Sequence, residues 1–307
     1  MKNLILNNNS KLLTLKYLPT YINFLFFKLL IKLPYRTQIF LGKKFGYFLK
    51  LTFPKKRKIV EKNISICYPE MNKTQVEFLC DKNFESIGVS FFEIANALFS
   101  SNKKIENLFE FSGFENLDKL VENESLIILT SHFTPMLLIA RALLLKTTIG
   151  YVYRPQNNLL FNRYMEKSFK QNGAIIIGSK DTKSMILALK NKIPLWYAPD
   201  QDLGHKNSIF APFFNIKTAT ITSTSRLAKI NNSRILHLSY FRSDNNKYKL
   251  MLSKPLKNIP TDNFYADCVE INRIIEEDIN IAQDQYLWAH KRFKTRPDGE
   301  SDYYKNL

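Results

Sequence analysis

The sequence predicts an α/β fold built on a layered, largely parallel sheet. Short, uncharged runs rich in β-branched residues alternate with segments of helical periodicity through the middle of the chain, which is the pattern of successive βαβ units. The 307 residues show no internal repeat, low-complexity tract or dividing linker, so one main domain is the simplest organisation. The chain has only 9 glycines and no Gly-rich phosphate loop, and we therefore do not expect a nucleotide-binding version of this fold.

The N-terminal region has the composition of a membrane-associated helix. Residues 21–33 are strongly apolar but include Lys28 and Lys32. Because a membrane span needs about 20 apolar residues, this segment predicts an interfacial helix whose lysines reach water, or a marginal span extended by residues 12–18. A buried helix of a soluble domain is the alternative, and Lys28 disfavours it. No small-residue cleavage site follows, so a removed signal peptide is not expected.

Charge points to anionic partners and to the side of the membrane. The net charge is +18, which favours nucleic acid, acidic membrane lipid, or a phosphorylated or acidic substrate. The apolar N-terminus makes nucleic acid the least expected of these. The basic residues Lys43, Lys44, Lys50 and 55–58 follow the apolar segment. These residues could simply be a solvated helix face. By the positive-inside rule they instead predict that the main domain lies on the cytoplasmic side of the membrane.

We expect residues 1–40 to form the membrane anchor or interfacial helix and residues 41–307 to form the main domain. Within that domain, residues 59–99 show helical spacing with a turn at Tyr68-Pro69. Strands are predicted at 126–129, 148–153, 174–177, 193–198, 235–241 and 248–252, and helices at 116–121, from 134 onward, and at 162–170, 182–190 and 266–281. The three cysteines lack metal-like spacing and are interpreted as isolated thiols in a reducing compartment.

The stretch from Leu126 to Arg141 is the candidate centre of the site. A short buried-type strand ends on Ser131-His132, and a helix is predicted with Thr134 as N-cap and Pro135 at its first position. His132 would then lie on a loop at the carboxyl end of a central strand, where α/β proteins bind ligands. An imidazole there can take a proton at neutral pH. The alternative is a histidine that only hydrogen-bonds its loop.

Further polar residues follow other predicted strands, namely Arg154, Asp200 and Asp202. Arg154 could make a forked contact to a phosphate or carboxylate, or could pair with an acid of the loop layer. The two aspartates could fix Arg154, orient a sugar hydroxyl or bind a cation, or they could serve turn chemistry alone. Two carboxylates do not make a metal site. No Gly-x-Ser-x-Gly motif occurs, which argues against a serine hydrolase.

Eight blocks of the sequence carry a family resemblance. They are Lys58–Val60, Asn63–Met71, Lys82–Gly88, the His132 region, Val152–Pro155, Trp196–Gly204, Phe210–Phe214 and Gln285–Gly299. In this order and spacing they resemble the late acyltransferases of lipid A biosynthesis, in particular the Kdo-dependent lauroyl type, nearly from end to end of the chain.

The resemblance implies a membrane-associated enzyme of the glycerolipid acyltransferase fold at the cytoplasmic face of a Gram-negative inner membrane. It would move a fatty acyl chain from acyl carrier protein to a hydroxyl on a hydroxyacyl chain of the Kdo-bearing lipid A precursor, without a cofactor or metal. Acyl carrier protein, this lipopolysaccharide precursor and the anionic inner-membrane lipids are all acidic partners, which suits so basic a chain.

The resemblance also implies roles for single residues. His132 would be the general base that removes the acceptor hydroxyl proton. Arg154 would bind an anionic group of the acceptor or stabilise the site, while Asp200 and Asp202 would support the site or bind the acceptor. Arg292 would help to bind substrate as part of a basic surface together with His290, Lys291, Lys294 and Arg296; the alternative is an ordinary solvated charge run.

One position departs from the family pattern. The family has Glu or Asp five residues after the histidine, and here that residue is Leu137, with no carboxylate between Glu124 and Glu166. An acid at that position holds the imidazole in its useful tautomer and stabilises its protonated form. Three interpretations follow: Asp200 or Asp202 orients His132 instead, the enzyme is slow, or the chain is a silent homologue that binds lipid or acyl carrier protein.

Overall fold

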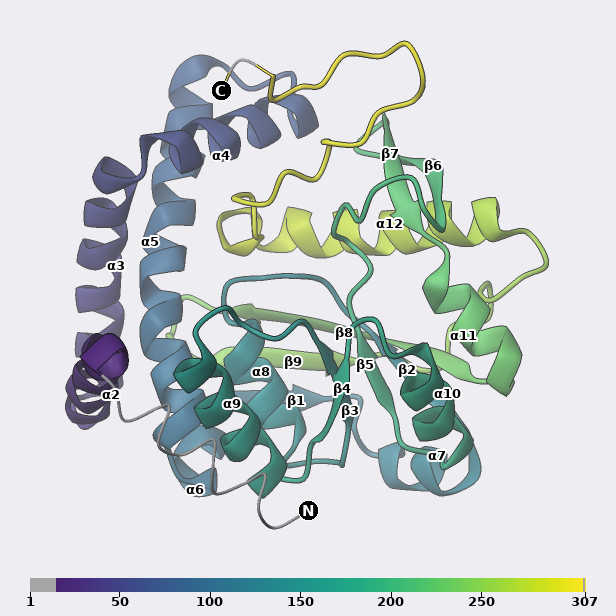
Figure 1. Cartoon of the computed structure of the whole chain (residues 1–307), viewed down its shortest axis with the longest axis horizontal. Helices are drawn as coiled ribbons and strands as arrows, with labels where there is room; N and C mark the ends of the chain where they lie inside the picture. Colours follow the sequence, from purple (N-terminus) through teal and green to yellow (C-terminus); the bar gives the residue numbers. More distant parts are fainter. Residues whose placement is uncertain (1–14, 306) are drawn as a thin grey trace.

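A seven-stranded sheet forms the centre of the molecule in the computed structural model, which describes residues 15–305 and 307. The strand order is β1-β9-β8-β2-β5-β3-β4, and every neighbouring pair is parallel except β8 and β9. The bounds are β1 Phe109–Ser112, β2 Leu126–Leu129, β3 Gly150–Tyr153, β4 Ile175–Gly178, β5 Leu195–Tyr197, β8 Arg234–Arg242 and β9 Tyr248–Leu252. All four residues of β2 are fully buried, so the apolar run of the sequence is the central strand (Figure 1).

Helices connect the parallel strands. They are α7 (Leu117–Asn123), α8 (Met136–Leu143), α9 (Leu159–Gln171), α10 (Thr182–Lys190) and α11 (Ser223–Asn231). Because β2 lies between β5 and β8 and runs parallel to both, the residues that follow β2 and β5 and the last residues of β8 meet at one edge of the sheet. The predicted α/β class and the largely parallel sheet are therefore confirmed.

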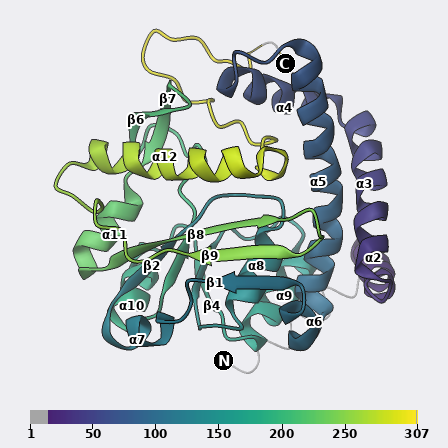
Figure 2. The same cartoon turned by 180° about the vertical axis from the view of Figure 1, so that it is seen from behind.

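A layer of N-terminal helices packs against one end of the sheet. It consists of α2 (Leu18–Leu30), after a short 3-10 turn at Leu15–Tyr17, and of α3 (Tyr35–Thr52), α4 (Pro54–Cys67), α5 (Lys73–Phe99) and α6 (Asn102–Glu106). The side chain of Asn72 caps α5 through a capping box with Gln75, which fixes where this 27-residue helix begins. Figure 2 shows α3 and α5 side by side from behind. Gly88 of α5 lies so close to Gly42 and Gly46 of α3 that the two backbones are almost in contact.

The remaining elements form a small layer beyond the carboxyl edge of the sheet. The antiparallel hairpin of β6 (Ser208–Phe213) and β7 (Ile216–Ile221) packs on α12 (Phe264–Ile281). After α12 the C-terminal segment contains a short 3-10 turn, Gln283–Gln285, and then runs back across the sheet edge as irregular chain. It forms an isolated antiparallel bridge between Tyr286 and Phe133, so it reaches the loop that follows β2.

Most predicted elements are present within a few residues. Elements that the sequence did not predict include β1, both strands of the β6–β7 hairpin, α6 and α11. The strands β6 and β7 pair only with each other, so they lie outside the βαβ pattern that predicted the main sheet. The start of α8 was predicted wrongly. Pro135 is the N-cap residue and the helix begins at Met136, with no side-chain capping bond, because the Thr134 hydroxyl bonds a different helix, as described below. Leu137 is accordingly the second helical residue, where the prediction made it the third.

The N-terminal apolar segment forms an exposed helix. No residue of α2 is buried, so the alternative of a buried helix is wrong, although Phe24 and Phe27 contact aromatic rings of α5 and α9. Among the described residues, no helix is both long and apolar enough to cross a membrane. Residues 12–14 of the possible extension lie outside the described part. The expected boundary at residue 40 lies inside α3.

Cys67, Cys80 and Cys268 are free, buried thiols.

Candidate active site

His132 and Asp200 form a close pair at the carboxyl edge of the sheet. The Nδ1 atom of His132 lies 2.6 Å from Oδ1 of Asp200, and the backbone N–H of His132 donates to Oδ2 of the same carboxylate at 2.9 Å. His132 follows β2 and Asp200 follows β5, which are adjacent parallel strands. The sheet therefore brings together two residues that are 68 positions apart in the sequence.

The electrostatics of the pair favour a charged carboxylate beside an oriented imidazole. The Asp200 side chain is 1% exposed and that of His132 is 22% exposed. Burial by itself would raise the pKa of the Asp200 carboxyl, but the His132 ring, its hydrogen bonds and the charge of Arg292 hold that pKa at about 2. The carboxylate is ionised at neutral pH and accepts the Nδ1–H of His132. Nε2 is then the basic nitrogen of the ring.

The backbone of the His132 loop is held by hydrogen bonds from β8 and from the C-terminal segment. The Tyr240 hydroxyl of β8 donates to the carbonyl of Ser131. The N–H of Leu287 donates to the carbonyl of His132 at 2.9 Å, and the N–H of Thr134 donates to the carbonyl of Gln285 at 2.8 Å. The C-terminal segment that follows α12 therefore holds the loop in place. This contact explains why the Gln285–Gly299 block belongs to the site although it follows the last helix.

Arg154 is an exposed cation at this edge. It directly follows β3, which pairs with β5, and its side chain is exposed. Among the described residues no hydrogen bond or ion pair of the Arg154 guanidinium is found, and Asp200 and Asp202 both bind other groups. The idea that an aspartate fixes Arg154 is therefore not what the structure shows. The guanidinium faces solvent on the strand next to Asp200.

Asp202 and Arg292 bind groups of the protein itself. The Asp202 carboxylate accepts from the N–H and hydroxyl of Thr295 and from the N–H of Gly204. Arg292 is 2% exposed and donates to the carbonyl of Ala219 and the hydroxyl of Thr220 on β7. The expected basic surface of the C-terminal signature is not formed as a whole, because Arg292 and Arg296 are both buried.

His290 lies beside the His132–Asp200 pair, whereas the resemblance implied for it only a place in a basic surface. Its Nε2 accepts from the backbone N–H of Asp202 at 3.1 Å, which leaves the hydrogen on Nδ1. Burial lowers the pKa of the His290 imidazole to about 4, opposed by the nearby charge of Asp200. This second histidine is therefore neutral at physiological pH. Only its tertiary contact with the Asp200 loop distinguishes it from the basic residues around it in the sequence.

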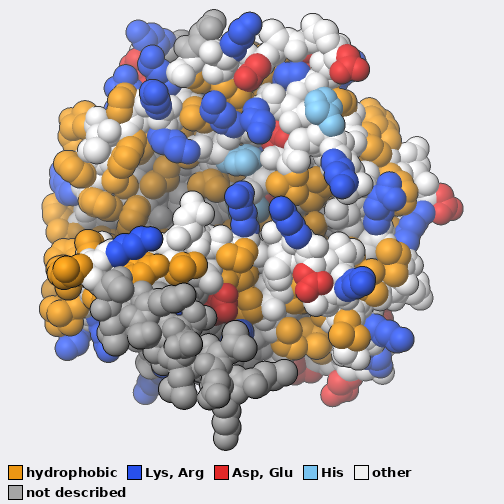
Figure 3. All heavy atoms as spheres, in the orientation of Figure 1, with side chains coloured by type: hydrophobic (Ala, Val, Ile, Leu, Met, Phe, Trp, Pro, Cys, Tyr) orange, Lys and Arg blue, Asp and Glu red, His pale blue; other side chains and the backbone are white. Residues whose placement is uncertain are grey.

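Figure 3 shows the face that contains this edge. Histidine side chains lie near its centre, Lys and Arg side chains surround them, and hydrophobic side chains cover the left edge, where Figure 1 draws α2 and α3. In the described part of the chain no three His, Cys, Asp or Glu side chains are grouped so that they could hold a metal ion. The chemistry on view is that of a base beside a buried acid, surrounded by positive charge.

The family model described as bacterial lipid A biosynthesis acyltransferase matches residues 6–295. The chain belongs to this family. It is 33% identical to the lipid A biosynthesis lauroyltransferase of Escherichia coli over 280 residues, covering 90% of this chain and 91% of that protein. It is 32% identical over 277 residues to the lipid A biosynthesis palmitoleoyltransferase of the same organism, with coverage of 89% and 90%.

A further relative agrees with this assignment. A lipid A biosynthesis acyltransferase of Haemophilus influenzae is 32% identical over 273 residues, with 87% of each chain covered. This lipid A acyltransferase therefore carries out acyl transfer in lipid A biosynthesis. In this chain the carboxylate that contacts His132 belongs to Asp200, which follows β5, the neighbour of β2. Leu137 has no carboxylate to supply. Among solved structures, a 1-acyl-sn-glycerophosphate acyltransferase from Thermotoga maritima aligns with a TM-score of 0.41 and 10% identity over 81% of this chain and 98% of that chain.

Proposed function

We propose that this lipid A acyltransferase moves a fatty acyl chain from acyl carrier protein to a hydroxyl on a hydroxyacyl chain of the Kdo-bearing lipid A precursor. The observation that carries the proposal is the hydrogen bond between Nδ1 of His132 and the buried Asp200 carboxylate. The exposed Arg154 follows β3, the strand that pairs with β5. The relatives named lauroyltransferase and palmitoleoyltransferase are almost equally similar. We propose lauroyl as the first donor chain to test, with palmitoleoyl as the second.

His132 acts as the general base in this proposal. Its Nε2 takes the proton of the acceptor hydroxyl while the hydroxyl oxygen attacks the thioester carbonyl. The tetrahedral intermediate collapses with cleavage of the carbon–sulfur bond. The thiolate of the carrier leaves and takes back the proton from the imidazolium. The products are the new ester and the free thiol of the carrier, so no oxidant, metal or cofactor is required.

Asp200 performs the orienting role that the family assigns to the acid five residues after the histidine. Its negative charge fixes the Nδ1–H tautomer and stabilises the imidazolium that forms during attack. The silent-homologue alternative rested on the absence of an acid at position 137. A buried, ionised carboxylate already in contact with the ring argues against that alternative, because the base does not lack a partner.

Arg154 is proposed to bind the acceptor directly, whereas Asp202 and Arg292 are proposed to support the acceptor site from within the protein. Arg154 binds a phosphate or carboxylate of the acceptor through its forked guanidinium. Asp202 and Arg292 support the acceptor site indirectly: Asp202 holds the 200–204 turn against Thr295, and Arg292 contributes positive charge near Asp200. Both are assigned to substrate binding only in this indirect sense.

The enzyme works at an anionic membrane surface, which we propose to be the cytoplasmic face of the inner membrane. The apolar side chains exposed on α2 and α3 form what we call the apolar helix face. Its members are Leu18, Ile22, Leu25, Phe26, Leu29, Phe40, Tyr47, Phe48 and Leu51. Lys28, Lys43 and Lys44 are exposed on the same two helices. The net charge of +18 attracts anionic lipids, the acceptor and acyl carrier protein alike.

The test is acyl transfer from lauroyl- and palmitoleoyl-carrier thioesters to lipid A precursor with and without Kdo. Wild type, His132→Ala, Arg154→Lys and the control Arg163→Lys, another exposed arginine, are compared. We expect His132→Ala to abolish transfer. Arg154→Lys should raise KM for the acceptor by about ten- to a hundredfold, the value of a charge-assisted fork, and Arg163→Lys should leave it unchanged.

Two results would contradict the proposal. Transfer that persists in His132→Ala would exclude this histidine as the base. A wild type that binds the precursor but transfers no chain from any carrier thioester would favour the silent homologue. Equal rates with and without Kdo would remove Kdo dependence alone and leave the transfer reaction in place.

A further inference from the structure

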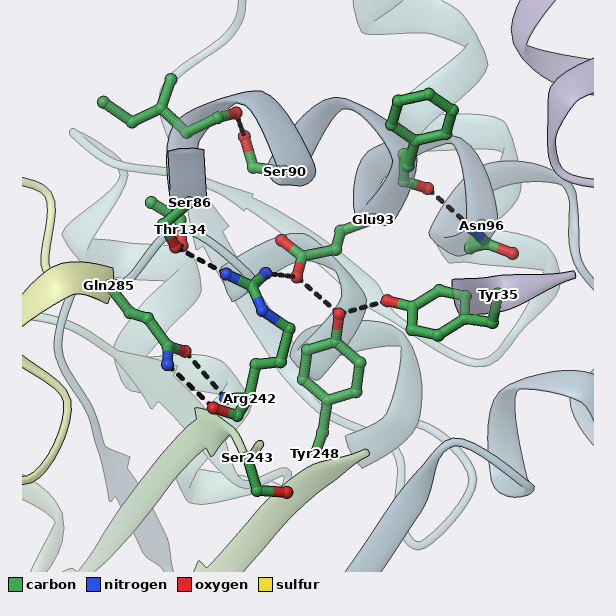
Figure 4. Close-up of polar contacts among 12 residues, drawn as sticks. Tyr35, Ser86, Ser90, Glu93, Asn96, Thr134, Arg242, Ser243, Tyr248 and Gln285 are labelled. Atoms are coloured by element: carbon green, nitrogen blue, oxygen red, sulfur yellow. Dashed lines mark hydrogen bonds and ion pairs between the residues drawn. The ribbon is translucent and has the colours of Figure 1, made fainter. Parts of the chain in front are cut away.

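A chain of polar contacts joins the His132 loop to an ion pair between strand β8 and helix α5 (Figure 4). The hydroxyl of Thr134, two residues after His132, lies 2.7 Å from the hydroxyl of Ser86 on α5. Nη2 of Arg242, the last residue of β8, donates to the Ser86 hydroxyl at 2.9 Å. Because Ser86 accepts from the arginine, its own O–H is available to donate to Thr134.

Arg242 is itself fixed on both sides. Its Nη1 binds the carboxylate of Glu93 on α5, and the two side chains are 8% and 1% exposed. Its backbone N–H donates to the side-chain carbonyl of Gln285, and its carbonyl accepts from the side-chain amide of the same residue, both at 2.8 Å. The backbone carbonyl of Gln285 in turn accepts a hydrogen bond from the backbone N–H of Thr134. Arg242 therefore reaches Thr134 by two routes.

The Arg242–Glu93 ion pair is also linked to helix α3 through Tyr248. The Tyr248 hydroxyl of β9 donates to the same Glu93 oxygen that binds Arg242, and it bonds the hydroxyl of Tyr35 at the start of α3. Burial raises the pKa of Glu93, and the charge of Arg242 opposes this. A buried pair of this kind contributes little net stability. Its geometry, in contrast, is strongly constrained, which suits a positioning role.

We propose that Arg242 and Ser86 are positioning residues for His132, which they hold through the hydroxyl of Thr134. The inference rests on the proposed role of His132 as the base. The pair of His132 with Asp200 sets the ring orientation, whereas the Arg242–Ser86–Thr134 chain sets the backbone two residues further on. A loop that can shift at Thr134 moves Nε2 away from the acceptor hydroxyl, and small misplacements of a base reduce turnover strongly.

The test removes single hydroxyls in a double-mutant cycle. Ser86→Ala, Thr134→Val and the double variant are assayed for acyl transfer with carrier thioester and lipid A precursor. We expect each single change to lower kcat about tenfold without changing KM for either substrate. The double variant should lose no more than the singles, because either change breaks the same bond.

Arg242→Lys tests the fork separately. A lysine keeps the positive charge opposite Glu93, but its single ammonium cannot reproduce the two-pronged contact to Glu93 and Ser86. We therefore expect the same tenfold loss of kcat, and no further loss when Ser86→Ala is added.

The matched control lies at the other end of the same two strands. The hydroxyls of Ser125 and Ser233 are 2.6 Å apart, and these residues directly precede β2 and β8. Ser125→Ala and Ser233→Ala remove the same type of bond at the amino edge, and kcat should stay within a factor of two of wild type.

A second measurement keeps the test independent of the proposed reaction. Amide hydrogen exchange of residues 131–134 and 136 should become about tenfold faster in Ser86→Ala and Arg242→Lys and should not change in Ser233→Ala. If wild type shows no transfer activity, the proposed function fails, and the exchange data still decide the positioning role. The inference is overturned if exchange is unchanged, if the losses of Ser86→Ala and Thr134→Val multiply in the double variant, or if the control variants lose as much activity.

Discussion

Asp200 contacts His132 twice, through the ring nitrogen Nδ1 at 2.6 Å and through the backbone N–H at 2.9 Å. One carboxylate thus fixes both the ring and the peptide that carries it. An acid within the helix that follows His132 could hold the ring without holding this N–H. The arrangement gives the base a partner from a neighbouring strand, independent of the residue at position 137.

The variant Asp200→Asn should therefore lose most of the turnover. The side-chain amide of the introduced asparagine can donate to Nδ1 of His132, which places the ring hydrogen on Nε2 and removes the basic nitrogen from the acceptor side. In a serine protease triad the comparable change lowers turnover by about ten-thousand-fold, and we expect a loss of kcat of at least about a thousandfold. Rates of acyl transfer at saturating substrates measure this effect.

The variant Leu137→Glu provides the companion measurement. In the wild-type background it should leave kcat within about a factor of two, because Nδ1 is already bound by Asp200. A large gain from Leu137→Glu alone would show that Asp200 does not perform the orienting role.

The stability of the protein should depend on the protonation of His290. Burial lowers the pKa of its imidazole from 6.5 to about 4, so the unfolded chain binds this proton more readily than the folded protein. The stabilising contribution is complete above pH 6.5 and is lost as the pH falls to about 4. It amounts to at most about 3.5 kcal/mol, at about 1.4 kcal/mol per pKa unit. Urea unfolding at pH 7, 5.5 and 4 measures this decrease.

His290→Gln is the control for that series. Glutamine can accept from the N–H of Asp202 but does not titrate, so the decrease between pH 6.5 and 4 should be smaller in this variant. Identical pH dependence in the two proteins would exclude His290 as its source.

The close crossing of α3 and α5 should not tolerate a methyl group. A Cβ atom added to Gly88 would lie 2.1 Å from the carbonyl oxygen of Gly42 and 2.3 Å from the N atom of Gly46, and both are backbone atoms that cannot rotate away. Gly88→Ala should lower the free energy of unfolding by about 1–3 kcal/mol, the usual cost of overpacking. Gly178→Ala is the matched control, because the nearest atom to its added Cβ is 3.9 Å away. Equal stability of Gly88→Ala and wild type in chemical denaturation would contradict the close packing.

The apolar helix face should determine binding to lipid. Replacing Phe48 and Leu51 together by serine removes two large side chains that are more than half exposed, and we expect the dissociation constant for anionic phospholipid vesicles to rise about tenfold or more. The control replaces Leu187 and Ile230, which are as exposed but lie on α10 and α11 at the opposite end of the molecule (Figure 1). Vesicle sedimentation at fixed ionic strength measures both. Equal binding of the two double variants would show that the α2–α3 layer is not the membrane-contacting surface.

Several features of this chain were predictable from the sequence because their causes are local. The four-residue apolar run at Leu126–Leu129 can only be satisfied as a central strand, and its boundaries are correct. The capping residues of α5 and the periodicity of α10 define those helices without reference to the rest of the chain. The rule that ligands bind at the carboxyl ends of parallel strands was sufficient to select His132, Arg154 and Asp200 as candidates.

The pairing of these residues was decided by the tertiary structure. Strand order placed β5 beside β2, so Asp200 became the partner of His132 and Asp202 turned toward Thr295; both are aspartates of one short loop, and their local sequence does not distinguish them. The same applies to Thr134, whose hydroxyl suits a helix cap but bonds Ser86 on α5, and to Arg292, which is buried within a segment of basic residues. The sequence by itself determined which strands and helices form and which polar residues follow them. Only the tertiary structure decided their partners, because hydrogen bonds between residues about 50 to 160 positions apart depend on which strands become neighbours.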